Sequence, residues 1–420
     1  MAIGRRYHTG VVSPFLPDPD KVAAIRELLP ATGAGIYLNA GTAGPVPAEV
    51  QRAMDEQAAR ELAVGRAHPD QFPEGLERMA EARASVAAAL VGDPDDIALT
   101  HSTTDGLHLA LAAIPWVAGD RVVTTNHEHP GLLGTLAALE RRSGVVRVTA
   151  DIGGGEDHAA TLAAIGEALR AGARAVAVSH VLWTTGAVLP VREIAVLARA
   201  AGAAVIVDGA QAAGAIPFAV DELGVDAYAL PAHKWLLGPE GMGALWVERH
   251  FADASVPDSA GMLSYASLGP GTPVLHAGAR RFEATTFHRP SVVGFARACG
   301  WLTMYVGLPW SQARAGALAA SAADRLAAID GVTLLTPRHA MGTLVTFRIA
   351  GWDAEAAVGE LGARAFAIVR ALPIDAVRAS VGFWNTPDEI ERFARVVELL
   401  AGHGPGTLPP RRTLPILEGA

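Results

Sequence analysis

The stretch 225–243, VDAYALPAHKWLLGPEGMG, contains Lys234, and the chain has only one other lysine, Lys21. Almost all other positive charge is arginine, which stays protonated and cannot act as an amine nucleophile. An apolar run that ends at Pro231 precedes Lys234, and a Gly- and Pro-rich loop follows it. Desolvation there would lower the lysine pKa and suit the amine to act as a base or to form a Schiff base. The plain alternative is a solvated surface lysine.

The composition is that of a globular protein with a large core. The chain of 420 residues is long enough for two domains, or for one large and one small domain, and half of its residues are hydrophobic. The formal charge of −9 argues against nucleic acid or an anionic membrane as a partner, because both need clustered basic surface. Cys299 is the single cysteine, so no internal disulfide can form. Because we find no signal-like N-terminus and no apolar run of about 20 residues, we expect a cytoplasmic protein.

Short apolar runs alternate with helical segments through the first two thirds of the chain. The runs cover residues 97–99, 121–125, 145–148, 175–178, 204–207, 227–230 and 243–247. Apolar strands separated by helices predict an α/β fold with a mainly parallel seven-stranded sheet covered on both faces. We expect four parts: an arm and helix (1–35) that packs with the small domain, a large domain (36–300), a small α+β domain (301–405) and a tail (406–420).

Polar residues follow several of these predicted strands, where ligands of such sheets bind. Thr103 and Thr104 open a helix whose N-terminus suits a phosphate, although a simple N-cap would explain them as well. His180 and Asp208 follow later strands, and Lys234 follows the next one. A lysine for an aldehyde, a carboxylate for a protonated ring nitrogen and a phosphate cradle together suit pyridoxal phosphate.

Two motifs in this region resemble those of the class V aminotransferases. They are VDGAQ (207–211) and AHKW (232–235), and the resemblance runs from YLNAGTAGPVP (37–47) to VRASVGFWNTPDEI (377–390). It implies fold type I of the pyridoxal-phosphate-dependent transferases, pyridoxal 5'-phosphate as cofactor, an amino-acid substrate and a homodimer with composite active sites.

The resemblance also implies a role for individual residues. Lys234 would hold the cofactor and move protons, Asp208 would pair with the ring nitrogen, and His129 would stack on the ring; these are the candidate catalytic residues. The other expected contacts are Thr103, Thr104 and His233 with the phosphate, Gln211 and His180 near the 3-oxygen, Thr286 with the phosphate of the partner subunit, and Arg378 and Asn39 with the substrate. Thr285 and Ala232 depart from the family pattern, which often has Gly and Ser or Thr there.

Within the family, several stretches look closest to the cysteine/cystine C–S lyases: SHVLWTTGAVLPV (179–191), HKWLLGPEGMGALWV (233–247) and NHEHPG (126–131). Isopenicillin N epimerase-like proteins are also similar at residues 37–47. We therefore expect β-elimination on a cysteine- or cystine-like amino acid, with transamination to a 2-oxo acid or epimerisation as alternatives that use the same residues. Cysteine desulfurases are disfavoured. They need a nucleophilic cysteine on a loop, whereas Cys299, the single cysteine, lies in an apolar helical segment.

Two other classes of protein could account for some of these residues. The triplet His127-Glu128-His129, with His101 or His180, could bind a metal, but no third ligand has a telling spacing, so we expect no metal. A non-catalytic binding module would leave the lysine, carboxylate and phosphate cradle unexplained. The glycines at 153–155 lack the spacing of a dinucleotide-binding loop.

Overall fold

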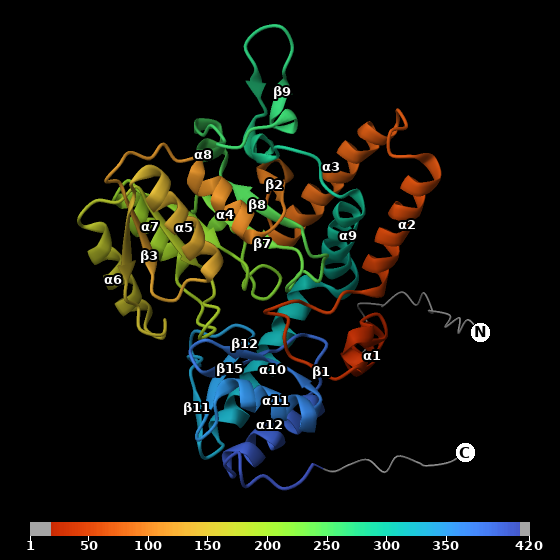
Figure 1. The fold of residues 1–420 in the computed structure, drawn as a ribbon, viewed down its shortest axis with the longest axis vertical. Coiled ribbons are helices and arrows are strands. Elements are labelled where there is room, and N and C mark those ends of the chain that lie inside the picture. The colour runs from red at the N-terminus through yellow and green to blue at the C-terminus, as the bar shows by residue number, and fades with distance from the viewer. Residues whose placement is uncertain (1–17, 412–420) are drawn as a thin grey trace.

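The computed structural model describes residues 18–411 of the chain (Figure 1). Residues 1–17 of the expected N-terminal arm and residues 412–420 of the expected tail lie outside the described residues. The first described helix is α1 (Asp18–Glu27), followed by the short 3-10 helix η1 (Pro30–Gly33). Arg26 on α1 forms an ion pair with Glu389, so this helix contacts the C-terminal part of the chain.

The central element is a seven-stranded sheet in the order β2-β8-β7-β6-β5-β3-β4. Only β8 runs antiparallel to its neighbours, so the sheet is mainly parallel, as predicted. Several strands extend one residue beyond the predicted end, and Asp208 is the last paired residue of β6 instead of following it. The strands are β2 (Ile97–Thr100), β3 (Arg121–Thr125), β4 (Val146–Ala150), β5 (Ala175–Ser179), β6 (Ala204–Asp208), β7 (Ala227–Pro231) and β8 (Gly243–Val247).

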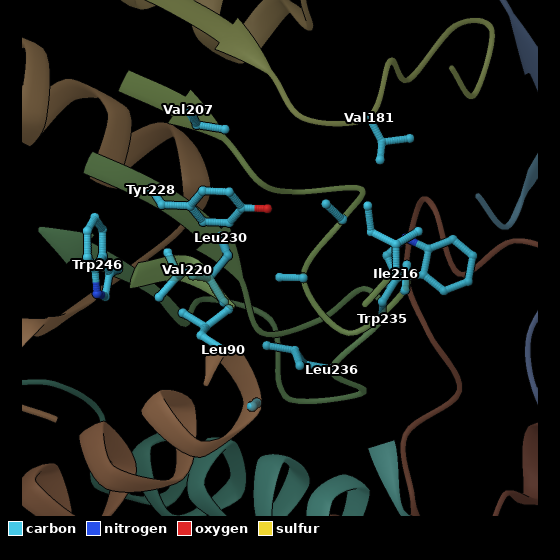
Figure 2. Packing of buried hydrophobic residues seen from close by; sticks show 14 of the residues in the cluster. Leu90, Val181, Val207, Ile216, Val220, Tyr228, Leu230, Trp235, Leu236 and Trp246 are labelled. Atoms are coloured by element: carbon cyan, nitrogen blue, oxygen red, sulfur yellow. The ribbon is translucent and has the colours of Figure 1, made fainter. Parts of the chain in front are cut away.

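Alternating strand residues build a core on each face of this sheet. In β5, Val176 and Val178 join one cluster, whereas Ala175 and Ala177 join the other. The first cluster is covered by α3 (Gln71–Leu90), α6 (His158–Leu169) and α7 (Val191–Ala200), and the second by α4 (Thr103–Ala112) and α5 (Pro130–Ser143). Figure 2 shows Leu90 of α3 packed near Tyr228 and Leu230 of β7. A strand period of two with both faces apolar explains why the sheet is buried on both sides.

A second, antiparallel sheet has the strand order β11-β12-β15-β14. Its strands are β11 (Val332–Leu334), β12 (Leu344–Ile349), β14 (Arg370–Leu372) and β15 (Ala376–Ser380). The core of this part includes residues from α10 (Leu308–Ala327), α11 (Ala354–Ala365) and α12 (Pro387–Ala401). The short β1 (Ile36–Tyr37) pairs in parallel with β13 (Ala367–Ile368), which brings the start of the chain to this C-terminal part.

Two connections hold the second sheet beneath the first (Figure 1). One is the helical path α9 (Arg289–Gly300), η6 (Trp301–Val306) and α10. The other is the segment 181–188, which we call the strap. Ala187 bridges to Met341, and the hydroxyl of Thr336 donates to the carbonyl of Thr185 at 2.6 Å. The strap therefore holds the connection between β11 and β12, and with it β15, which pairs with β12, close to the carboxyl ends of the parallel strands.

Residues 255–279 contain a hairpin that projects from the molecule (Figure 1) and for which the sequence predicted no strands. Its strands are too short to give a periodic sequence signal, which explains why they were missed. The remaining elements are α2 (Ala48–Val64), α8 (Arg249–Ala254), β9 (Tyr265–Ser267), β10 (Val274–Leu275), η2 (Pro94–Asp96), η3 (Val220–Glu222), η4 (Met262–Ser264) and η5 (Gly278–Phe282).

Within residues 18–411 no single helix combines the length and the apolar composition of a membrane span. One bent pair, 289–306 with 308–327 at 81°, meets both criteria only when its two helices are taken together.

Candidate active site

A pocket of about 260 Å³ lies where the ends of the parallel strands meet the second sheet and the strap. It brings together residues that are widely separated in the sequence. The predicted site residues that line it are Thr103, Thr104, His129, Asp208, Gln211, His233, Lys234 and Arg378. Three predicted residues do not line it: Asn39, His180 and Thr286.

Lys234 occupies a tight turn directly after β7. The turn is closed by hydrogen bonds from the Leu237 N–H to the Lys234 carbonyl and from the Gly44 N–H to the His233 carbonyl, at 3.2 and 2.7 Å. A Cβ at Gly44 would lie 2.2 Å from the Lys234 carbonyl oxygen, so only glycine allows residues 39–45 to approach this closely. The backbone of Lys234 is thus held from both sides.

Burial lowers the pKa of Lys234 to about 8. The Asp208 carboxylate opposes this shift, while the charges of Arg378 and Arg370 add to it. Since an ordinary lysine has a pKa of about 10.4, a much larger fraction of this amine is unprotonated near neutral pH. The lowered pKa agrees with the desolvation that the sequence predicted, while the role of Lys234 as a base stays a prediction.

Asp208 is buried at the end of β6. Its Oδ1 accepts a hydrogen bond from the Ala210 N–H at 2.9 Å, and burial raises its pKa despite the opposing charge of Lys234. A Cβ at Gly209 would lie 2.0 Å from the Tyr228 ring, so the residue after Asp208 must be glycine. A buried carboxylate beside an amine can balance a cationic ring nitrogen, which would also relieve its desolvation.

His129 caps the N-terminus of α5 and points an imidazole toward the pocket. Its Nδ1 accepts from the Gly131 N–H at 3.0 Å, which places any single ring proton on Nε2. Burial, followed by the charges of Lys234, Arg378 and Arg370, lowers its pKa to about 4. The neutral ring packs edge-to-face against Trp183 with a centroid distance of 5.1 Å. A flat, neutral, fixed ring of this kind can stack on an aromatic ligand.

The N-terminus of α4 supplies hydrogen-bond donors to the same pocket. Ser102 is the N-cap, and Thr103 and Thr104 form the first turn of this ten-residue helix. The buried Nδ1 of His233 has no hydrogen-bond partner within residues 18–411. Free donors at a helix N-terminus, together with an unsatisfied imidazole nitrogen, fit a phosphate group. The residues present therefore fit the cofactor that the resemblance implies.

Arg378 is buried on β15 and is aimed by two distant segments. Its Nη1 donates to the Trp183 carbonyl of the strap at 3.0 Å, and its Nη2 donates to Thr42 Oγ1 at 3.3 Å. Thr42 in turn donates to Asn39 Oδ1 at 2.8 Å. Burial and then the charge of Arg370 lower the pKa of Arg378 to about 10. Asn39 thus does not line the pocket itself, but its side-chain oxygen holds the hydroxyl of Thr42, which does.

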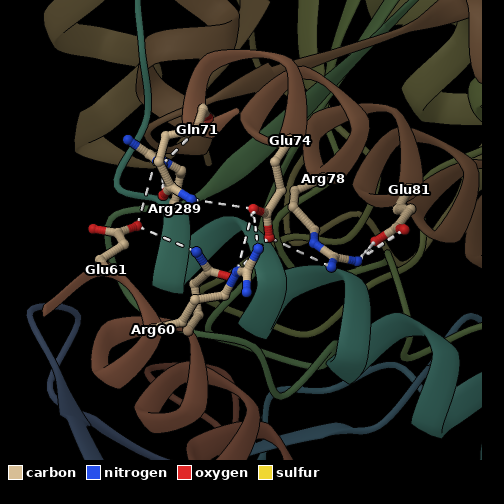
Figure 3. Close-up of polar contacts among 8 residues, drawn as sticks. Arg60, Glu61, Gln71, Glu74, Arg78, Glu81 and Arg289 are labelled. Atoms are coloured by element: carbon tan, nitrogen blue, oxygen red, sulfur yellow. Dashed lines mark hydrogen bonds and ion pairs between the residues drawn. The ribbon is translucent and has the colours of Figure 1, made fainter. Parts of the chain in front are cut away.

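His180 and Thr286 lie away from the pocket. His180 is buried directly after β5, and its Nδ1 is 2.9 Å from Tyr228 Oη. Thr286 lines a second pocket of about 340 Å³ with Phe287 and Arg289. Figure 3 shows the arginine and glutamate pairs beside this pocket, including the ion pair of Arg289 with Glu61. The expected roles of His180 and Thr286 stay predictions.

Gln211 lines the pocket, but its amide already bonds to protein groups. Its Nε2 donates to the Gly41 carbonyl at 2.8 Å, and its Oε1 accepts from Trp235 Nε1 at 3.1 Å. One amide proton is left for a ligand, so its predicted contact with the 3-oxygen stays a prediction.

The side chains of residues 127–129 make three different sets of contacts. His127 bonds to Thr184 and to the Gly153 carbonyl, while His129 lines the pocket. Glu128 is buried and accepts from Thr125 and Ser179, and burial raises its pKa to about 7. Among the described residues, no group of three or more His, Cys, Asp or Glu side chains is arranged to hold a metal ion.

Seven residues that line the pocket were not among the predicted site residues: Gly41, Thr42, Ser102, Trp183, Ala210, Pro231 and Arg370. Arg370 pairs with Arg378 across β14 and β15. The signal was present in the spacing of the two arginines around the turn at 373–375, but β14 is only three residues long and was not predicted.

Comparison with known proteins identifies a matching family model and similar chains. The family model described as Aminotransferase class-V matches residues 36–393. A probable cysteine desulfurase of Methanothermobacter thermautotrophicus is 28% identical over 405 residues, covering 90% of this chain and 98% of the relative. The isopenicillin N epimerase of Streptomyces clavuligerus is 29% identical over 385 residues, covering 87% and 95%.

Solved structures agree with this placement. A mutant of C-DES with glycine covalently linked to its PLP cofactor has a TM-score of 0.84 and 25% identity, covering 89% of this chain and 99% of that chain. The complex of the cystine C–S lyase C-DES with its reaction product cysteine persulfide has a TM-score of 0.83 and 25% identity, covering 88% and 99%. These likenesses confirm the predicted fold class and the family resemblance.

Proposed function

The chain belongs to the class V aminotransferase family, and from that premise we propose that it is a pyridoxal-phosphate-dependent carbon–sulfur lyase. Its reaction would be β-elimination on a cysteine- or cystine-like amino acid. The observation that carries the proposal is the single pocket in which the Lys234 amine, the buried Asp208 carboxylate and the N-terminus of α4 come together. The relatives named for cysteine desulfurase and C–S lyase activity support the sulfur substrate.

The pocket residues divide between the parts of the cofactor. Lys234 would bond to its aldehyde carbon as a Schiff base, Asp208 would pair with its ring nitrogen, and His129 would stack on its ring. Thr103, Thr104 and His233 would bind the phosphate, with Gln211 and His180 on the side of the 3-oxygen. Once bound, the cofactor supplies an electron sink for charge that develops at Cα of the substrate.

The protein's own side chains would then bind the substrate and move its proton. Arg378, buried and held by the Trp183 carbonyl and Thr42, would hold the α-carboxylate through its guanidinium. Lys234, with its pKa near 8, would accept the Cα proton. The Cβ–S bond breaks and the sulfur leaves as a thiolate or persulfide; hydrolysis of the remaining three-carbon unit gives pyruvate and ammonia.

A desulfurase reaction fits these residues less well than elimination. Desulfurases transfer sulfur to a cysteine thiolate near the substrate, but Cys299 is fully buried in α9, and burial raises its pKa. The hairpin between β14 and β15 is a short turn at residues 373–375, without a longer loop that could carry a thiol to the pocket. We therefore propose that sulfur leaves in solution.

Incubation with single substrates tests the proposal. Cystine or cysteine alone should yield pyruvate with persulfide or sulfide, and Lys234→Ala should abolish that yield. Strict dependence on a 2-oxo acid, with formation of a new amino acid, would instead assign transamination. Loss of optical activity without pyruvate would assign epimerisation.

We also propose a homodimer in which Thr286 reaches the phosphate of the partner subunit. Thr286 lies in the second pocket, and the exposed apolar residues Phe72, Met262, Leu268 and Val274 lie in the surrounding segments. Mixing Lys234→Ala protein with Thr286→Ala protein should restore part of the activity, because one mixed site receives both intact side chains. A cofactor-saturated monomer in solution would refute the proposal.

The division at 35/36, 300/301 and 405/406 is retained as a proposal, with the two sheets as the centres of the large and small domains. We also propose a cytoplasmic location, which cell fractionation would test.

A further inference from the structure

The strands β3 and β5 separate toward their carboxyl ends. Their parallel pairing covers only Val122 with Ala175 and Val123 with Val176, whereas β3 with β4 and β5 with β6 pair over five residue pairs each. The chain leaves β3 for β4 on one side and returns to β5 on the other side, so this opening lies where the strand order reverses. Ligands of parallel sheets bind in the crevice at such a point.

Two side chains bridge the opening where the backbone pairing has ended. The hydroxyl of Thr124 donates to the Ala177 carbonyl at 2.8 Å. Farther along, Glu128 Oε2 accepts from the Ser179 N–H at 2.9 Å and from the Ser179 hydroxyl at 2.5 Å, while Oε1 accepts from the Thr125 hydroxyl at 2.6 Å. All five residues are buried, so each bond satisfies a group that water does not reach. We call the three bonds of Glu128 the Glu128 clamp.

The Glu128 clamp joins the two segments that form one wall of the pocket. His129 directly follows Glu128 at the N-terminus of α5, and the strap begins two residues after β5. Trp183 of the strap packs against the His129 ring, and both side chains line the pocket. A second contact joins the same segments, because His127 Nδ1 lies 2.8 Å from Thr184 Oγ1. The clamp therefore sets how the strap and the start of α5 lie relative to each other.

The position of the His129 ring depends on where α5 begins. Its hydrogen bond from the Gly131 N–H belongs to the first turn of that helix, so it moves with the helix and does not tie the ring to the sheet. On one side the helix start lies tightly against α4, since a Cβ at Gly131 would lie 2.5 Å from Thr104 Oγ1. On the other side the Glu128 clamp attaches it to β5. The ring is thus placed by contacts that its neighbours make.

We propose that Glu128 is a positioning residue for His129: by spanning the opening between β3 and β5, it holds the imidazole in the plane that stacks on the cofactor ring. The role depends on the reach of the side chain and not on its charge. The inference rests on the proposed stacking of His129, but not on the sulfur substrate or on elimination. It gives the His127-Glu128-His129 triplet a function that needs no metal.

The surroundings of the Glu128 carboxyl group favour reach over charge. Burial, with a further contribution from the charge of Asp208, raises its pKa to about 7. Near neutral pH the group is therefore ionised in only part of the molecules. The three donors that face it, two hydroxyls and one backbone amide, also bond to a neutral oxygen acceptor.

Two substitutions of Glu128 separate reach from charge. Glu128→Gln keeps the length and an oxygen acceptor, whereas Glu128→Asp keeps the carboxylate but is one methylene shorter. Fluorescence titration of the full chain with pyridoxal phosphate measures the affinity, and visible circular dichroism of the loaded protein reports the orientation of the bound ring. Asp226→Ala is the control, because Asp226 accepts from the Val205 N–H at 2.7 Å at the opposite, amino ends of the strands and does not line the pocket.

Glu128→Asp should weaken cofactor binding about tenfold, as expected when one buried hydrogen bond is left unmade, and should reduce the visible circular dichroism. Glu128→Gln should stay close to the wild-type protein in both measurements. Asp226→Ala should unfold at lower denaturant concentration, as Glu128→Asp does, but should keep the affinity and the circular dichroism. Ser179→Ala removes one of the three bonds and should change both measurements in the same direction by a smaller amount.

A double-mutant cycle tests whether Glu128 acts through His129. In a His129→Ala background, Glu128→Asp should cause no further loss of cofactor affinity, because the ring that it positions is absent. If Glu128→Asp does not fold, Ser179→Ala takes its place in the cycle.

Three outcomes would overturn the proposal: wild-type affinity and circular dichroism in both Glu128→Asp and Ser179→Ala, equal losses in Glu128→Gln and Glu128→Asp, or fully additive losses in the cycle. The second outcome would assign the effect to the charge of Glu128, and the third to a part of the pocket other than His129. Failure of the proposed function gives a different result. If the cycle shows coupling but no pyruvate forms from cysteine or cystine, the positioning role stands and the lyase chemistry does not.

Discussion

The proposed reactivity of the Lys234 ε-amino group depends on its pKa, which its surroundings shift in opposite directions. Burial and two arginines disfavour the ammonium form, whereas Asp208 favours it, and the balance lies at about 8. Lys21, the only other lysine, lies 3.9 Å from the centroid of the Trp310 ring and does not line the pocket. Lys21 is itself buried and burial lowers its pKa as well, so it serves as a second buried amine, outside the pocket, with which Lys234 can be compared.

Labelling of the cofactor-free protein with acetic anhydride should follow the lowered pKa of Lys234. Only the unprotonated amine reacts, so labelling should rise as the pH increases through about 8. Asp208→Asn removes the charge that favours the ammonium form, so it should move the midpoint to lower pH. Mass spectrometry of the Lys234 peptide measures both effects. A midpoint near the ordinary lysine value of about 10.4 would contradict the burial of the amine.

The contact of Thr42 with Arg378 predicts a change in substrate affinity. Thr42→Val removes one hydrogen bond to a charged group and should raise KM by about tenfold with a small change in kcat, since such bonds contribute about 1.5 kcal/mol or more. Arg378→Lys should have a larger effect because a lysine cannot form the two-pronged contact with a carboxylate. Steady-state kinetics on both variants distinguish a positioning role from a catalytic one. An unchanged KM in Thr42→Val would show that Arg378 needs no support from residues 39–42.

At the scale of elements, the turn after β7 and the segment 39–45 form one unit. Gly44→Ala places a methyl group 2.2 Å from the Lys234 carbonyl oxygen, so one segment must move. We expect a loss of about 1–3 kcal/mol in stability and weaker cofactor binding. Gly33→Ala is a matched control, because a Cβ there meets no atom within 4 Å. Equal cofactor affinity in the two variants, measured by fluorescence titration, would show that the two segments are not coupled.

The elements that could be predicted from the sequence are those with a clear pattern of apolar residues. The seven strands of the large sheet could be found because each is an apolar run between helices, and their ends located most of the pocket. The strands β9, β10 and β14 have two or three residues each, too few to show alternation. Arg370 was missed for that reason. His180 shows a second limit: it follows a strand as predicted, but its ring turns toward Tyr228, and side-chain direction depends on packing that a local pattern does not contain.

At the scale of the whole molecule, the strap couples the two sheets. The Thr336 hydroxyl donates to the Thr185 carbonyl and accepts from the Thr346 N–H at 2.8 Å. Thr336→Val leaves the Thr185 carbonyl and the Thr346 N–H buried without a partner, so we expect the free energy of unfolding to fall by about 1–3 kcal/mol for each unpaired group. We also expect a higher KM, because the strap holds Arg378 through the Trp183 carbonyl. Thr333→Val, at an exposed position of β11, is the control. Denaturant unfolding and KM measurements would contradict the coupling if the two variants behaved alike.

Reduction of the purified holoenzyme with borohydride tests the central claim most directly, because it fixes a Schiff base at the lysine that forms it. We predict that the visible absorption band disappears and that the peptide containing Lys234 alone gains the mass of the reduced cofactor. The same treatment of Lys234→Ala should give no labelled peptide, whereas a Lys21→Ala variant should be labelled like the wild-type protein. An adduct on Lys21, or no adduct in a protein that retains activity, would contradict the assignment of Lys234 and Asp208 as the cofactor site.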